Sequence, residues 1–141
     1  MIHEEKIQNK CPAGALDRQY ILNKNQCLSY LLQIEKLPEE ARTVTGNRIG
    51  DCEICQEVCP WNIKHLRNPL PTDMTKKFQN KIGEWENFFY LPHLAGISEK
   101  EYIEKLGHLN TDIPYKIFHR NVLIAIKNIG KTDTDSFANK P

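Results

Sequence analysis

Short apolar runs separated by polar stretches characterise the first half of the chain. One run, residues 20–22, is long enough only for a brief strand. The next apolar residues recur near helical spacing, at Leu28, Leu31, Leu32 and Ile34. This pattern predicts a helix that begins near Asn25, with Asn23 or Asn25 as its cap, and ends before Pro38. A second short helix is expected from Pro38, because the two glutamates that follow it suit a first helical turn.

A third short helix is expected within residues 51–62, ended by Pro60, because proline disfavours helix for the residue before it. Residues 64–84 are polar and are interrupted by Pro69 and Pro71. They predict a linker between two halves of the chain.

Helical spacing dominates the second half. Ser98 and Glu101 form the S-x-x-E signature of a capped helix start. Pro114 suits the first turn of a longer helix. Its buried stripe is expected at Phe118, Val122, Ala125, Ile126 and Ile129. Gly130 should end this helix, and the tail at 133–141 is expected to be disordered.

Length, composition and charge exclude several classes. The 141 residues suit one domain, or one domain with a small appendage, and their formal net charge of +1 gives no reason to expect nucleic-acid or membrane binding. No apolar run approaches the roughly 20 residues of a membrane span. The polar N-terminus lacks the apolar region of a signal peptide, so a cytoplasmic location is expected.

The cysteines are the strongest chemical signal, and there are five: Cys11, Cys27, Cys52, Cys55 and Cys59. An odd number without a secretion signal argues against a disulfide framework. Metal or cluster ligation is therefore the better interpretation.

Three cysteines form the run C-x2-C-x3-C-P at residues 52–60. In bacterial-type ferredoxins the cysteine before proline ligates a different cluster from the others in its run. By that rule Cys59 would serve another cluster than Cys52 and Cys55, whereas Cys11, which also precedes a proline, would serve theirs. Cys27 then completes four thiolates for one [4Fe–4S] cluster, and Cys59 is left without a partner.

A four-cysteine zinc site is the alternative, because zinc binds the same thiolates. The two cysteines that are each followed by proline favour iron–sulfur. A brown protein with sulfide and about four irons per chain would decide for the cluster.

Four stretches of the chain are also similar to a known family: CPAGAL (11–16), QCLSYL (26–31), GNRIGDCEICQEVCPWN (46–62) and HRNVLIAIKNIG (119–130). They resemble the C-terminal part of epoxyqueuosine reductase. The resemblance implies two [4Fe–4S] clusters and a cobalamin, in an enzyme that reduces the epoxide of epoxyqueuosine in transfer RNA. It implies the same ligation, with Cys59 as a ligand of the second cluster.

The chain also departs from this family. Residues 1–10 hold no cysteine, where the family carries three. The longer region that holds cobalamin is absent as well. We therefore expect no bound cobalamin and no catalytic residue in this chain, and a separate cobalamin-domain chain is a candidate partner.

The expected long helix is basic, and the corresponding region of the family resembles a HEAT-like module that helps to hold transfer RNA. Lys116, Arg120 and Lys127 are candidate RNA contacts, with a solvated helix face as the alternative. Trp61 is expected to shield the cluster from solvent, and Asp51 to be solvated. The histidines show no ligand spacing and are expected at the surface or in packing.

The sequence therefore predicts a mostly α fold: a ferredoxin-like [4Fe–4S] domain with an α+β remnant over residues 1–66, and a small helical HEAT-like module over 67–141. The predicted function is electron transfer within an epoxyqueuosine reductase-like, tRNA-modifying oxidoreductase of queuosine biosynthesis, inactive alone. The alternative is a non-enzymatic binding module with a structural four-cysteine zinc or cluster site.

Overall fold

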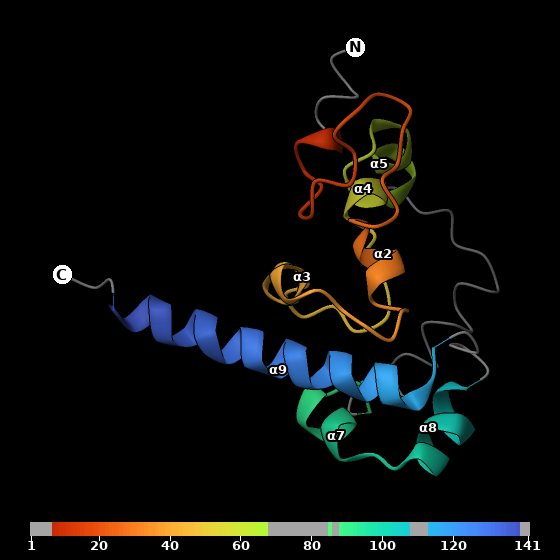
Figure 1. Ribbon diagram of the computed structural model, residues 1–141, viewed down its shortest axis with the longest axis vertical. Coiled ribbons are helices and arrows are strands. Elements are labelled where there is room, and N and C mark those ends of the chain that lie inside the picture. Colours follow the sequence, from red (N-terminus) through yellow and green to blue (C-terminus); the bar gives the residue numbers. More distant parts are fainter. Residues whose placement is uncertain (1–6, 68–84, 86–87, 108–112, 139–141) are drawn as a thin grey trace.

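The protein is helical in the part that its computed structural model describes, residues 7–67, 85, 88–107 and 113–138, with the backbone alone at 66 and 131–138. These ranges contain one isolated antiparallel bridge and no strand. The helices are α2 (Leu28–Leu31), α3 (Glu39–Val44), α4 (Ile54–Glu57), α5 (Pro60–Arg67), α7 (Leu91–Gly96), α8 (Glu99–Leu106) and α9 (Tyr115–Ala138). Figure 1 shows α9 crossing the molecule between α2–α5 on one side and α7 and α8 on the other. None of the described helices is long and apolar enough to cross a membrane.

The strand predicted at residues 20–22 is a tight turn. Arg18 and Ile21 form the isolated bridge, and the amide of Ile21 donates to the carbonyl of Arg18 at 3.3 Å. Tyr20, between them, has a φ of 59°, in the left-handed region that an extended strand never uses. The chain therefore reverses within the apolar run, and a short run cannot reveal this because its residue types also suit a strand.

The first predicted helix is shorter than its apolar pattern suggests. It begins at Leu28 rather than near Asn25, and its N-cap, Cys27, makes no side-chain cap. The side chain of Asn23 instead accepts a hydrogen bond from the amide of Asn25 at 3.2 Å, within a turn. Asparagine offers the backbone this local alternative to a helix, which explains the late start. The predicted helix after Pro38 is confirmed as α3, with both glutamates in its first turn.

Pro60 has a different role from the predicted one. The short helix α4 already ends at Glu57, and Pro60 starts α5, which continues to Arg67. Proline fits a first helical position because its missing amide hydrogen has no partner there. Residues 64–67 are thus helical, and the rest of the predicted linker, 68–84, lies outside the described residues.

The capped helix predicted at Ser98 is confirmed as α8, because the amide of Glu101 donates to Ser98 Oγ at 3.2 Å. A continuous apolar core joins α7, α8 and α9; it consists of Leu94, Ile97, Tyr102, Leu106, Ile113, Ile117, Phe118 and Val122. The hydroxyl of Tyr115 also donates to the carbonyl of Ile97 at 2.8 Å. The polar end of the Tyr115 ring thus has a hydrogen-bond partner beside the apolar core.

Helix α9 is longer than predicted. It passes through Gly130 and continues to Ala138, so the predicted stop and the predicted disorder of residues 133–138 are wrong, and residues 139–141 lie outside the described part. A glycine costs a helix only about 1 kcal/mol, which the following helical residues can offset. The buried stripe is confirmed at Phe118, Val122 and Ala125, whereas Ile129 is 40% exposed. Figure 1 shows why: the C-terminal end of α9 runs beyond α7.

Side chains on α9 also fasten the segment between α2 and α4. Arg120 donates to the carbonyls of Ile34 and Glu35 at 2.7 and 2.6 Å. Asn128 donates to the carbonyls of Arg42 and Gly46 at 2.8 and 2.9 Å. These bonds join residues more than 80 positions apart in the chain, so the two predicted domains pack directly on each other.

Candidate iron–sulfur site

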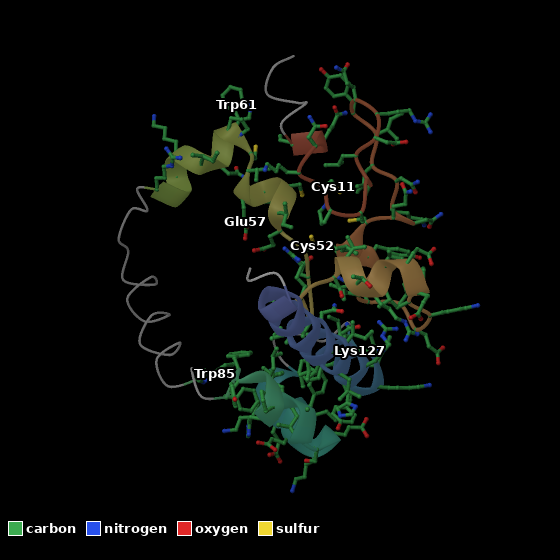
Figure 2. The ribbon with its side chains drawn as sticks, turned by 90° about the vertical axis from the view of Figure 1, so that its left-hand side faces the viewer. Cys11, Cys52, Glu57, Trp61, Trp85 and Lys127 are labelled. Atoms are coloured by element: carbon green, nitrogen blue, oxygen red, sulfur yellow. The ribbon has the colours of Figure 1, made fainter. Side chains whose placement is uncertain are left out.

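All five cysteines line one cavity of about 520 Å³. They come from three separate segments: the turn after residue 10, the start of α2, and the stretch that contains α4. Apolar side chains complete the wall, among them Ala15, Leu22 and Leu28. Figure 2 shows Cys11 and Cys52 close together at this end of the molecule. The structure therefore brings together every cysteine that the sequence singled out.

A tight turn aims Cys11 into the cavity. Gly14 has a φ of +65°, which glycine adopts without strain, and its amide donates to the carbonyl of Cys11 at 3.2 Å. The amide of Ala15 donates to the sulfur of Cys11 at 3.2 Å. A donor at this position stabilises a thiolate. The CPAGAL stretch thus supplies both the bend and a hydrogen bond for its sulfur.

The segments that carry Cys27 and Cys52 are joined by a hydrogen-bonded clip. Ser29, on α2 just after Cys27, accepts from the amide of Cys52 at 3.2 Å and donates to the carbonyl of Cys52 at 3.1 Å. Asp51 hydrogen-bonds Ser29 Oγ and accepts from the amide of Cys52 at 2.6 Å. Asp51 is exposed, as expected, and its carboxylate also caps this clip. Sequence reasoning missed Ser29, which no spacing rule marks.

The last two cysteines lie close together in the chain, Cys55 on α4 and Cys59 between α4 and α5. The amide of Cys59 donates to the carbonyl of Gln56 at 3.3 Å, and Asn62 Nδ2 donates to the same carbonyl at 3.1 Å. These bonds connect α4 to the start of α5. Cys59, expected to have no partner cysteine, lies on the same cavity as the other four.

The thiol of Cys52 has a raised pKa. Burial is the main cause, because it disfavours the charged thiolate. A hydrogen bond at the backbone of Ile54 and the positive charge of Arg48 lower the pKa, whereas Cys55 and Cys11 nearby raise it. The protein alone thus favours the protonated form of this thiol.

The donor set fits a polynuclear cluster. All five thiols are free and half-buried. In the described part of the chain, no three His, Cys, Asp or Glu side chains approach one another closely enough to hold a single ion. The five cysteines line a shared cavity, which suits a cluster because each of its thiolates binds a different iron.

Trp61 does not cover this cavity. Its side chain is 82% exposed and, in Figure 2, it points outward from α5. The expectation of a shielding role is therefore wrong, and the reason is that Pro60 starts a helix that turns the next side chain away from the cavity.

The three basic candidates on α9 have different environments. Lys116 pairs with Glu35 at 3.1 Å on the surface. The guanidinium of Arg120 is half-buried and bonded to backbone carbonyls, whereas Lys127 is exposed. The packing role expected of the histidines is confirmed for His119, whose Nε2 lies 3.0 Å from the carbonyl of Ala95. The RNA contacts of Lys116, Arg120 and Lys127 stay predictions.

The comparison with protein families identifies the class of this site. Residues 8–62 match the model of the 4Fe-4S double cluster binding domain. This range contains all five cysteines and, apart from Ile7, the residues that line their cavity. This part of the chain is thus similar to an iron–sulfur cluster-binding domain.

Individual relatives narrow the class further. The chain is 36% identical over 126 residues to epoxyqueuosine reductase of Bacillus subtilis and 31% identical over 125 residues to that of Salmonella typhimurium. These matches cover 86% and 84% of the chain, which spans about 30% of the length of either relative. The solved structure of the Bacillus subtilis enzyme matches with a TM-score of 0.67 and 33% identity, over 87% of this chain and 32% of that one. A crystal structure of epoxyqueuosine reductase with a tRNA-Tyr epoxyqueuosine-modified stem loop matches with a TM-score of 0.65 and 30% identity, over the same shares. The chain is epoxyqueuosine reductase-like.

Proposed function

We propose that Cys11, Cys27, Cys52 and Cys55 hold one [4Fe–4S] cluster, and that the chain is the electron-transfer part of an epoxyqueuosine reductase-like, tRNA-modifying oxidoreductase of queuosine biosynthesis. The convergence of the cysteines on one cavity supports this proposal most directly. A bound cluster would supply a one-electron redox couple, whose potential depends on hydrogen bonds to its sulfurs and on solvent exposure.

The residues around the cavity have separate tasks in this proposal. The amide of Ala15 stabilises the charge on the sulfur of Cys11. Ser29 and Asp51 fix the backbone of Cys52. Leu28, which is 2% exposed, anchors α2 in the core and thereby places Cys27 at the cavity wall. We assign no catalytic residue among them.

Cys59 is proposed as a ligand of a second cluster. The matching family model describes a double cluster domain, and two clusters with four thiolates each need more cysteines than the five present. The chain alone is therefore proposed to hold one cluster, to bind no cobalamin and to be inactive towards epoxyqueuosine by itself. A separate cobalamin-domain chain is the candidate partner that would restore activity, and a cytoplasmic location stays a prediction.

Single substitutions test the ligand assignment. The protein is loaded anaerobically with iron and sulfide, and its iron, sulfide and visible absorption are measured. Cys55→Ser should abolish the broad absorption near roughly 400 nm, whereas the matched variant Cys59→Ser should keep about four irons per chain. Iron loss from the Cys59 variant would refute the ligand set. A colourless wild-type protein that carries one zinc would refute the cluster itself.

We also propose that the exposed face of α9 contacts transfer RNA, as the complex of the structural relative suggests. Lys127 and Lys116 are the residues to test, because removing Arg120 would also break bonds within the protein. Replacing both lysines with alanine should weaken binding of a tRNA anticodon stem loop and reduce its salt dependence. Lys105→Ala on α8 is the matched control; equal binding by all variants would refute the contact.

A further inference from the structure

The buried amide of Asn121 lies between the two segments that carry Cys27 and Cys52. Its side chain is 0% exposed, and Nδ2 donates to the carbonyl of Leu32 at 2.8 Å and to that of Ile49 at 2.9 Å. Leu32 is the C-cap of α2, whose N-cap is Cys27. Ile49 lies just ahead of Cys52. We infer that Asn121 is a positioning residue for the proposed cluster, because its amide fixes these two segments relative to each other.

The chemistry of the amide explains why this position needs asparagine. The two carbonyls that meet here are both acceptors, so they cannot bond each other. One NH2 group carries two donors, and a single buried side chain can therefore satisfy both carbonyls. Aspartate offers no donors in this place, and leucine removes the donor to Ile49 and leaves the carbonyl of Leu32 with only a long 3.5 Å bond from Arg120.

A neighbouring side chain fixes the orientation of this amide. Arg120 donates from Nε at 3.1 Å and from a terminal nitrogen at 2.8 Å to Oδ1 of Asn121. Oδ1 is thereby held towards the guanidinium and Nδ2 towards the two carbonyls. Arg120 also donates to the carbonyls of Ile34 and Glu35, so both residues hold the chain just after α2.

The two joined segments have little structure of their own. Helix α2 has only four residues, and a single turn is not stable in isolation. The stretch from residue 46 to 53 contains no helix or strand. The clip at Ser29 joins the segments close to Cys52, and Asn121 joins them at the opposite end of α2. Two separated attachments fix orientation as well as distance, which the Ser29 clip alone does not.

Asn128 provides a matched control on the same helix. Its amide nitrogen also donates to two carbonyls, those of Arg42 and Gly46. The segment between these two residues carries no cysteine. A loss of general stability should therefore follow from either substitution, but a loss of cluster retention should follow chiefly from the one at Asn121.

The test uses the full chain loaded with iron and sulfide, and thus rests on the proposed cluster. Wild type, Asn121→Leu and Asn128→Leu are compared by Tm, by the rate at which a chelator bleaches the visible absorption, and by the midpoint potential. Both variants should have a lower Tm. Asn121→Leu should lose its cluster about tenfold faster than wild type, as substitutions of outer-shell partners commonly do, and should shift the potential. Asn128→Leu should stay close to wild type in both.

Arg120→Lys is the second variant if Asn121→Leu does not fold. It keeps the cation but removes the bonds that orient the amide, so bleaching should again be faster with a smaller fall in Tm. Equal bleaching rates and potentials in the Asn121 (or Arg120) and Asn128 variants would overturn the inference. A wild-type chain that takes up no iron would overturn the proposed function, and the inference with it. This outcome is distinguishable, because wild type and every variant would then lack the visible absorption alike.

Discussion

The cysteine region, residues 11–59, and the helical region, residues 91–138, are stabilised differently. The helical region has a continuous core in which Leu94 and Val122 are 0% exposed. The cysteine region has a smaller core around Leu28 and Leu37, and its helices α2 and α4 have four residues each. Apolar burial can account for the stability of the helical region. The cysteine region depends on cross-links: hydrogen bonds from α9 and, in our proposal, the cluster.

This difference has a functional meaning. A region that takes its order from bound sulfur and iron can place ligands from three separate segments without a large core. The cysteine region therefore depends on the helical region, because residues on α9 donate hydrogen bonds to its carbonyls. The helical region thus also stabilises the cysteine region.

Removing the cluster should have the largest effect and tests the contrast directly. Chelation of the iron should raise amide hydrogen exchange in the cysteine region almost to that of an unfolded segment, whereas α8 and α9 keep their protection. Exchange measured by mass spectrometry checks this. Equal protection of residues 11–59 with and without iron, together with an unchanged circular dichroism spectrum, would contradict it.

A core substitution should next affect the helical region. Phe118 is 1% exposed, and Phe118→Ala should lower the free energy of unfolding by about 3–5 kcal/mol through the cavity that it leaves. Leu123, on the same helix, is 49% exposed, and Leu123→Ala should change this free energy by less than about 0.5 kcal/mol. Urea unfolding followed by circular dichroism measures both. Similar losses in the two variants would mean that the core is not where we place it.

Two glycines should respond in opposite directions to alanine. Gly14 has a φ of +65°, so Gly14→Ala should cost roughly 1–2 kcal/mol although nothing obstructs the added carbon. Gly130 lies within α9 and is also unobstructed, so Gly130→Ala should gain up to about 1 kcal/mol. The Tm of each variant gives the sign. A stabilising substitution at residue 14 would contradict the role of the turn that presents Cys11.

The smallest effect is expected from the ion pair that joins the two regions. Lys116 and Glu35 are 83% and 79% exposed, so their coupling should be below about 1 kcal/mol and should fall with salt. A double-mutant cycle with Lys116→Met and Glu35→Gln measures it. A coupling above this range, unaffected by salt, would contradict the weak, screened interaction expected of two exposed charges.

Features with a local cause were predictable from the sequence. The helix at Ser98 needs only its own cap, and the helix after Pro38 only its own glutamates. The convergence of the cysteines follows from a spacing that metal chemistry imposes. The family resemblance, carried by the same stretches, agrees with the matches to epoxyqueuosine reductases.

Features with a tertiary cause were not predictable. Nothing near Asn121 in the sequence indicates that its amide binds carbonyls 89 and 72 positions earlier. The reversal at Tyr20 is hidden because the same residue types suit a strand. The continuation of α9 through Gly130 depends on a balance of about 1 kcal/mol, which local propensity does not decide.

The late position of Asn121 in the chain has a consequence for biosynthesis. A ribosome makes the chain from its N-terminus, so all five thiols emerge before the helix whose amide orders two of their segments. Until then the carbonyls of Leu32 and Ile49 face water, and the segments that carry Cys27 and Cys52 have only the Ser29 clip between them. Productive delivery of iron and sulfide should therefore follow synthesis of α9, and nascent chains that stall before α9 should display metal-free cysteines.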